Sequence, residues 1–448
     1  MFCNGTGAKG FNCFVVKISQ PVMGGALKMT TKSFAISKAM VWQAYKRVRA
    51  KGGAAGIDDQ SIEAFEMDLK NNLYKLWNRM ASGSYFPPAV KRVEIPKADG
   101  GKRPLGIPTV SDRIAQMVVK EAFEPEVEKY FHEDSYGYRP EKTAYQAVGV
   151  ARQRCWRNDF VLDVDIKGFF DTIDHEMLMK AVRKHSECKW VILYIERWLK
   201  APVKREDGQL ENRDKGTPQG GVISPLLANL YLHYVFDIWM NKYYPGIQFE
   251  RYADDIVIHM RNEGQAKIFR KCLEERFAKC KLVLHPEKTK IVYCKDDDRT
   301  AKYPNTSFTF LGYEFRPRGA KNKYGKLFCN FLPAVSRKAL TRMKRTVRAW
   351  KLQRGTEKSL EDLSRMFNPI VRGWIQYYGK YYKSALFPLA DQINRRLAKW
   401  VENKYKKFRR RPKQAKYTLG RMARNKKGLF AHWSILGYLP ADGTKRAV

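Results

Sequence analysis

Hydrophobic residues return at helical spacing along residues 37–80. They flank a glycine-rich break at 52–56 and are Met40, Tyr45, Val48, Phe65, Leu69, Leu73 and Leu76. A recurrence every three or four positions places side chains on one face of a helix, and clustered glycines interrupt a helix. The pattern predicts two helices joined by a loop.

A period-2 alternation occupies residues 160–166, where every second side chain, starting with Phe160, is apolar. Successive residues of a strand point to opposite faces, so the acids Asp163 and Asp165 share one face. The other face is apolar and consists of Phe160, Leu162, Val164 and Ile166. The pattern predicts a strand that buries one side and presents carboxylates on the other.

Asp254 and Asp255 form a second acidic pair, between Phe249 and the apolar run 256–258. This arrangement favours a β-hairpin with the acids at its tip. Carboxylates are ligands that Mg²⁺ prefers, and acids from two strands can hold two ions about 3.5–4 Å apart for phosphoryl transfer. The acids of these two segments are therefore candidate catalytic metal ligands.

The same patterns predict further elements. Residues 90–95 are typical of a strand and 98–101 of a hairpin turn. Ser224 and Pro225 are typical of a helix start, continued by an amphipathic helix over 226–240. After residue 331, one helical stripe is apolar and the other faces are basic; the stripe is Val335, Ala339, Met343, Val347 and Trp350.

Charge is concentrated at the C-terminal end of the chain. The 448 residues carry a formal net charge of +40, and this length suggests two or three domains. Residues 331–448 hold 30 Lys and Arg against 6 Asp and Glu, a net charge of +24. Clustered basic charge favours nucleic acid as a partner, and the densest stretch, 404–427, suits a surface that follows phosphates.

The eight cysteines are scattered, form no C-x₂-C pair and end at Cys329. This usage is typical of reduced, structural cysteines. With His432 as the only histidine after residue 330, the C-terminal part is expected to lack a zinc-binding module. No apolar run approaches the roughly 18 residues of a membrane span, and the first 30 residues lack a leader pattern. We expect a cytoplasmic protein with no membrane partner.

Short motifs stand in a characteristic order along the chain, at 82–85, 95–97, 102–108, 135–140, 163–171, 216–221, 252–255, 285–290 and 310–313. Together they resemble the reverse transcriptases encoded by bacterial group II introns, over about residues 29–437. Residues 366–379 resemble the maturase signature of that family. Without zinc ligands near its C-terminus, the chain is similar to the compact, endonuclease-lacking branch.

The resemblance implies an α+β fold: the fingers and palm of a right-hand polymerase, with an antiparallel palm sheet, followed by an α-helical thumb/maturase domain. The expected divisions are a disordered extension before a natural start at Met29 (1–28), an N-terminal helical extension (29–89), fingers and palm (90–330), the thumb/maturase domain (331–403) and a basic nucleic-acid-binding tail (404–448).

The resemblance also implies that the catalytic metal ligands are Asp165, Asp254 and Asp255. The remaining acids nearby are interpreted as local hydrogen-bond partners or surface charge; they are Asp163, Asp171 and Asp174.

The resemblance further implies nucleotide-binding roles for five residues. Lys97 and Arg103 would grip the triphosphate, as a point charge and a bidentate donor. Phe170 would exclude the ribose 2′-hydroxyl, although a core role is an open alternative. Gln219 lies in a turn whose glycines permit close approach to the nucleotide or template. Lys288 would stabilise the leaving pyrophosphate.

The implied activity is RNA-directed DNA polymerisation with two Mg²⁺ ions and dNTPs, in which a primer 3′-hydroxyl attacks the α-phosphate. The implied partners are an RNA template, a DNA primer or target, and the parent intron RNA, whose splicing and mobility the protein assists. Residues 310–313 correspond to a primer grip and Arg139 to template support. An RNA-binding splicing cofactor with vestigial polymerase activity and an RNA-copying polymerase stay open as alternatives.

Overall fold

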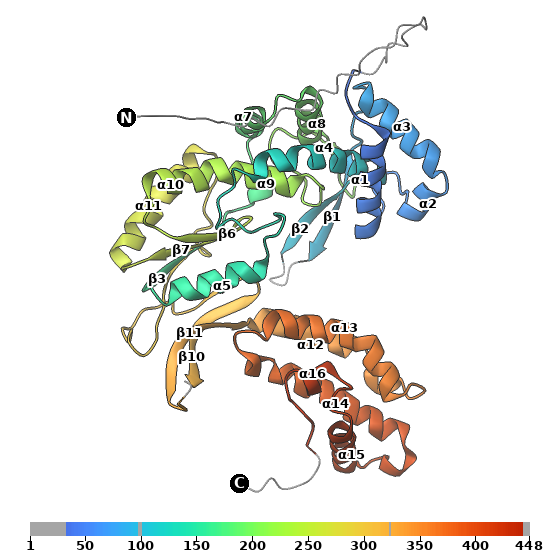
Figure 1. Ribbon diagram of the computed structural model, residues 1–448, viewed down its shortest axis with the longest axis vertical. Helices are drawn as coiled ribbons and strands as arrows, with labels where there is room; N and C mark the ends of the chain where they lie inside the picture. Colours follow the sequence, from blue (N-terminus) through green and yellow to red (C-terminus); the bar gives the residue numbers. More distant parts are fainter. Residues whose placement is uncertain (1–32, 97–100, 322–323, 442–448) are drawn as a thin grey trace, which may run out of the picture.

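A computed structural model describes residues 33–96, 101–321 and 324–441 (Figure 1). The predicted disorder of residues 1–28 lies outside these ranges. The described chain mixes helices with three small sheets, as an α+β sequence pattern predicts. No helix in the described ranges has the length and apolarity needed to cross a membrane.

The N-terminal region forms three helices where the sequence predicted two. These are α1 (Lys38–Lys51), α2 (Ile62–Glu66) and α3 (Leu69–Ala81). The second predicted helix is broken at Met67 and Asp68, which separate α2 from α3. All three lie at one end of the molecule, where α1 packs on the long helix α4 (Val110–Glu128) (Figure 1).

The predicted strand and hairpin near residue 90 are confirmed. Strand β1 (Val90–Pro96) pairs antiparallel with β2 (Lys102–Ile107), with Pro96 opposite Lys102. This pairing brackets the predicted turn, of which residues 97–100 lie outside the described ranges. Two short strands, β4 (Val203–Lys204) and β5 (Leu210–Glu211), extend the sheet in the order β2-β1-β4-β5.

The acidic motifs lie on a second, four-stranded sheet in the order β6-β7-β3-β8, antiparallel throughout. Its strands are β3 (Phe160–Val164), β6 (Phe249–Tyr252), β7 (Asp255–Met260) and β8 (Lys290–Tyr293). One face, with Leu162 and Ile258, packs in a core shared with α11 (Glu263–Lys279). The opposite face, with Val161 and Val257, packs in a second core with α5 (Ala144–Cys155). Figure 1 shows the sheet between these helices.

The helix predicted over 226–240 is buried instead of amphipathic. It consists of α9 (Ser224–Leu232), a π-helical turn (His233–Asp237) and α10 (Ile238–Tyr243). Ser224 is the first helical residue rather than the cap, and its hydroxyl accepts a 2.8 Å hydrogen bond from Thr217. The helices that lead to it are α6 (Phe169–Thr172), α7 (His175–His185) and α8 (Lys189–Lys200).

A third sheet joins the acidic sheet to the C-terminal helices (Figure 1). Its order is β11-β10-β9, from β9 (Phe308–Phe310), β10 (Tyr313–Lys321) and β11 (Leu327–Val335). The helices that follow are α12 (Arg337–Ala349), α13 (Leu360–Tyr378), α14 (Phe387–Lys404), α15 (Pro412–Asn425) and α16 (Ala431–Ser434). The predicted stripe is confirmed in α12, where Ala339, Met343 and Val347 are buried; Val335 instead ends β11, and Trp350 caps the helix.

Residues beyond 404 fold back onto the preceding helices. His432 and Trp433 are buried, and both side chains contact the Asn394 amide oxygen of α14 at 2.8 Å. Leu419 of α15 joins the same hydrophobic core as Trp400. The basic residues of this region therefore stand on a packed helical scaffold.

Candidate active site

The acids of the two predicted motifs lie side by side on one face of the four-stranded sheet. Val164 of β3 faces Ile256 of β7 in an antiparallel pair. Asp165 follows Val164 and Asp255 precedes Ile256 at the same end of this pair, so the register brings these carboxylates together. Asp254 lies immediately before Asp255 and belongs to the two-residue turn, 253–254, between β6 and β7.

The charges of neighbouring carboxylates contribute to raised pKa values at Asp254 and Asp255. Surrounding protein atoms and the charges of Asp254 and Asp165 raise the pKa of Asp255 to about 7, although its side chain still reaches water. Partial desolvation and the charge of Asp165 also raise the pKa of Asp254, while Arg103 and Arg251 oppose this shift. Crowded negative charge of this kind is relieved by a bound cation.

Asp163 belongs to the same acidic cluster, contrary to the interpretation from sequence. Desolvation, followed by the charges of Asp255 and Asp165, raises the pKa of its carboxyl to about 7. Its position two residues before Asp165 on the same strand face was the available signal. The interpretation of Asp174 is confirmed, because it caps α7 and pairs with Lys281 at 2.5 Å.

The donor chemistry of this cluster suits Mg²⁺, which favours carboxylate oxygens. In the described part of the chain, however, no three Asp, Glu, His or Cys side chains converge as a complete metal site. Mg²⁺ usually takes one or two carboxylates and completes its shell with water and substrate phosphates. The acids therefore fit the protein's share of a site that substrate would complete.

The segment 283–289 holds Asp165 in place. The backbone carbonyl of Asp165 accepts a 2.8 Å hydrogen bond from the His285 amide. The Thr289 hydroxyl lies 3.3 Å from both the amide nitrogen and the carbonyl oxygen of Asp165. Lys288 reaches the Asp165 carboxylate, with 3.9 Å between Nζ and Oδ2. The predicted lysine is thus beside the acids.

The turn that carries Asp254 is held in an unusual backbone conformation. Ala253 has φ 57°, a left-handed value that is uncommon for a residue with a side chain. Gly137 lies directly against it, since a Cβ at Gly137 would be 2.4 Å from the Ala253 amide nitrogen. Strained backbone of this kind persists where its surroundings over-determine it.

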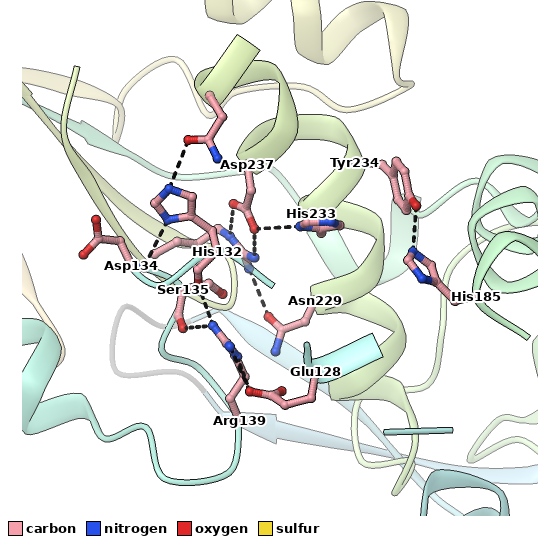
Figure 2. A network of polar contacts seen from close by, with 12 residues as sticks. Glu128, His132, Asp134, Ser135, Arg139, His185, Asn229, His233, Tyr234 and Asp237 are labelled. Carbon is pink, nitrogen blue, oxygen red and sulfur yellow. Dashed lines mark hydrogen bonds and ion pairs between the residues drawn. The ribbon is translucent and has the colours of Figure 1, made fainter. Parts of the chain in front are cut away.

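Arg251 is the main support beneath this turn. Its guanidinium is fully buried, donates to the Ala253 carbonyl at 3.2 Å and to the Asn229 amide oxygen at 3.0 Å, and makes two hydrogen bonds to Asp237. Asn229 in turn donates to the Gly137 carbonyl at 2.6 Å. Figure 2 shows Asn229, Asp237 and His233 gathered in this network.

Asp237 reaches Arg251 from the π-helical turn. A π turn inserts a residue into an α-helix and is frequent at functional sites. Burial opposes ionisation of Asp237, but the charge and hydrogen bonds of Arg251 outweigh it, so the pKa of this carboxyl lies below its ordinary value. The buried ion pair stays charged and fixes the end of β6.

Arg139, to which the resemblance assigns template support, makes several contacts within the protein. Its guanidinium pairs with Glu128 at 2.8 Å and donates to the carbonyls of His132 and Ser135 (Figure 2). Only 6% of the side chain is exposed. These contacts fold the loop that contains Gly137.

Arg103 and Gln219 come from two segments that meet at β2. Arg103 is exposed on β2 and acts electrostatically on Asp254 and Asp255. The Gln219 carbonyl accepts a 2.6 Å hydrogen bond from the Gly106 amide of the same strand. The glycines of this turn were expected to let a nucleotide or template approach. At Gly220 the close neighbour is instead the protein itself, because a Cβ added to this glycine would lie 2.4 Å from the Gly106 carbonyl oxygen. Lys97 lies outside the described residues.

Phe170 is a half-buried residue of α6 that packs at the edge of the first core. Its ring meets that of Phe169 edge-on, with 5.4 Å between centroids. Its carbonyl accepts a 2.7 Å hydrogen bond from the Thr217 amide, which ties α6 to the 216–221 loop. Both interpretations of Phe170, sugar selection and core packing, are compatible with this position.

Comparisons with known proteins agree with these sequence blocks. Residues 95–315 match the family described as reverse transcriptase (RNA-dependent DNA polymerase), and residues 340–418 match the group II intron maturase-specific domain. Protein YkfC of Escherichia coli K12 is 31% identical over 312 residues, covering 61% of this chain and 78% of YkfC. The group II intron-encoded protein LtrA of Lactococcus lactis is 34% identical over 193 residues, covering 42% of this chain and 32% of LtrA. The chain thus spans about a third of the length of LtrA in this match.

Proposed function

This chain belongs to the family of group II intron-encoded reverse transcriptases and maturases, and we propose that it copies RNA into DNA at Asp165, Asp254 and Asp255. The observation that carries the proposal is the antiparallel register that joins acids from β3 and β7, with Lys288 beside them. Primer extension on an RNA template, with dNTPs and Mg²⁺, tests it.

We assign the parts of a right-hand polymerase to this fold. The N-terminal helical extension is 29–89, fingers and palm are 90–330, and the thumb/maturase domain is 331–403. Residues 404–448 provide a basic nucleic-acid-binding surface. The four-stranded antiparallel sheet serves as the palm, and the β1–β2 hairpin as part of the fingers.

The three acids would hold two Mg²⁺ ions, which activate the primer 3′-hydroxyl and stabilise the leaving oxygen. The chain's own residues position the reactants around them. Arg103 suits bidentate contact with the triphosphate of the dNTP, and Lys97 is assigned to the same group. Gln219 contacts the incoming nucleotide or the template, and Lys288 stabilises charge on the departing pyrophosphate.

Phe170 is proposed to select deoxyribose by occupying the space of a ribose 2′-hydroxyl. Phe170→Val should raise the ratio of rNTP to dNTP incorporation roughly 10-fold, which corresponds to relief of about 1.4 kcal/mol of steric clash. The measurement is single-nucleotide addition to a primer on an RNA template with each sugar.

Phe169→Val is the matched control, because Phe169 is buried in the same helix. It should lower thermal stability through the loss of packing without changing the sugar ratio. If Phe170→Val behaves like Phe169→Val, Phe170 is a core residue and the RNA-copying alternative gains support.

The turn that carries Asp254 is proposed to need Gly137 for its position. Gly137→Ala places a methyl group 2.4 Å from the Ala253 nitrogen, so the turn must move. A displacement of about 1 Å near reacting groups can cost 100-fold in rate. We expect nucleotide addition to fall about 10- to 100-fold, measured on pre-bound primer–template.

Gly246→Ala is the corresponding control, since nothing lies within 4 Å of a Cβ at Gly246. Template binding should remain near the parent value in both variants. Full activity in a folded Gly137→Ala protein would show that the catalytic turn does not depend on this contact.

The second proposed activity is assistance of intron RNA splicing and mobility. It is supported by the match of residues 340–418 to the maturase-specific domain and by the exposed basic residues of α12 and α15. RNA is bound chiefly through its shape, its 2′-hydroxyls and its loop bases. The partners we propose are an RNA template, intron RNA, a DNA primer or target, and dNTPs.

A further inference from the structure

Tyrosines of α13 and the residues just after it surround the turn between β9 and β10. The ring of Tyr313, the first residue of β10, lies 5.4 Å from Tyr377, 5.2 Å from Tyr378 and 5.9 Å from Tyr381. The Tyr377 hydroxyl donates to the Leu311 carbonyl at 3.0 Å, and the Tyr313 hydroxyl donates to the Tyr377 carbonyl. The helix and the turn are therefore joined by reciprocal hydrogen bonds.

The turn itself is constrained from several sides. Phe310 faces Tyr313 in the ladder, so Leu311 and Gly312 form a two-residue hairpin loop. Both have left-handed backbone, with φ 51° and 81°, which leucine adopts only under constraint. A Cβ at Gly312 would lie 2.7 Å from the Tyr378 hydroxyl. On the opposite side, the Gly312 carbonyl accepts a 2.9 Å hydrogen bond from the Ser336 amide.

The same tyrosines extend to the catalytic hairpin. Burial, with the nearby hydroxyls of Tyr378 and Tyr252, raises the pKa of Tyr377 to about 12. Tyr377 therefore remains a hydrogen-bond donor at neutral pH. Tyr252 is the last residue of β6, immediately before Ala253 and Asp254. Tyr252, Leu311 and Tyr377 also pack against the same hydrophobic core. The helix that carries the maturase-like segment thus approaches both the strand that leads to the acids and the Leu311–Gly312 turn, to which the resemblance assigns the primer grip.

We propose that Tyr377 and Tyr378 are positioning residues for the primer 3′ end, which act by holding the Leu311–Gly312 turn. The inference rests on the proposed polymerase function and adds to it, because it gives a role in nucleotide addition to residues of the segment matched as maturase-specific. Neither tyrosine needs to touch the reacting atoms.

Tyr377→Phe tests the inference, because it removes one hydroxyl and keeps the ring. The net value of one such hydrogen bond predicts a fall of about 2- to 12-fold in the rate of nucleotide addition from bound primer–template. We expect the KM for dNTP and the thermal midpoint to stay near the parent values. A primer with a mismatched 3′ end should lose extension further than a matched primer.

Tyr382→Phe is the matched control. Its hydroxyl also donates to a β10 carbonyl, that of Gly319 at 3.2 Å, but away from the turn. If the parent chain extends primers and Tyr377→Phe adds nucleotides at the same rate as Tyr382→Phe, the inference is overturned and the proposed function stands. A parent chain that extends no primer overturns both.

Gly312→Ala supplies a second test that does not depend on a single hydrogen bond. The new methyl group crowds the Tyr378 hydroxyl, so the rate of nucleotide addition should fall. Adding Tyr378→Phe removes the crowding atom and should restore part of the rate, a coupling that a double-mutant cycle measures. Strictly additive effects in the cycle would contradict the role of Tyr378.

Discussion

Asp254→Ala should reduce cDNA synthesis by at least about 100-fold, because even changes to the residues that support metal ligands cost 10–100-fold. Asp254 lies in the turn between β6 and β7, beside Asp165 and Asp255. Removing its carboxylate takes away one of the three proposed metal ligands. Primer extension on an RNA template over a range of Mg²⁺ concentrations measures the effect.

RNA binding should remain near the parent value in Asp254→Ala, because the basic surface lies on other elements. Asp298→Ala, at an exposed turn residue, is the control and should be fully active. Activity of Asp254→Ala within a few-fold of the parent would remove Asp254 from the metal site. A parent protein that splices RNA but extends no primer would instead support the splicing cofactor with vestigial polymerase activity.

Nucleic-acid affinity should fall by roughly 10³–10⁵ between 50 and 200 mM salt if the basic region neutralises about 6–10 phosphates. The exposed basic residues after residue 404 are numerous enough; they are Lys406, Lys407, Arg409, Arg410, Arg411, Lys413, Lys416, Arg421, Arg424, Lys426 and Lys427. Two lysines of the predicted cluster already have partners in the protein. The Lys404 ammonium contacts the carbonyls of Thr356 and Lys358, and the Lys426 ammonium pairs with Glu361 at 2.6 Å. Equilibrium binding of RNA at several salt concentrations measures the salt dependence.

Replacing Lys413, Lys416 and Lys427 with glutamine should make the log–log slope of affinity against salt shallower, by roughly 0.9 for each phosphate that the variant no longer neutralises. The same change at Lys267, Lys271 and Lys279 of α11 is a charge-matched control. Intron splicing at low Mg²⁺ should suffer more from the first set than from Asp254→Ala. The opposite ranking would contradict the two-function proposal and leave a polymerase alone.

The acidic strands could be predicted because their pattern is local. Alternation over 160–166 indicates β3 and places both acids on one of its faces, and the apolar run after Asp255 indicates β7. The prediction that only one side of β3 is buried is wrong at Val161, which lies on the acidic face and is buried in the second core. The interpretation of Asp163 was wrong because the environment of this residue depends on Asp255, about 90 positions away in the sequence. The two acids come together only when β3 pairs with β7 in the fold. Sequence periodicity indicates the face of a strand but not the charge that the opposing strand brings.

The supports of the site could not be predicted for the same reason. Arg251 precedes the acidic pair in sequence, yet its partners Asp237 and Asn229 come from a helix whose π turn has no sequence signature. The ion pair of Arg139 with Glu128 likewise joins a loop to the end of α4, and no local pattern indicates it. Long-range burial decided each of these cases.

The four-stranded sheet has one face in each of the two hydrophobic cores, and this division has a consequence for biosynthesis. On one of these faces, Val161, Val257 and Val292 pack against α5 and against aromatic residues of β9–β11 and of the helices beyond. While the ribosome is still translating residue 300, that face lacks its final cover, and exposed apolar surface makes nascent chains prone to aggregation. The last strand of the sheet, β8, ends at Tyr293, but one face of the sheet is fully covered only after the C-terminal region has emerged. A gene fragment that stops before β9 therefore leaves the second hydrophobic core incomplete.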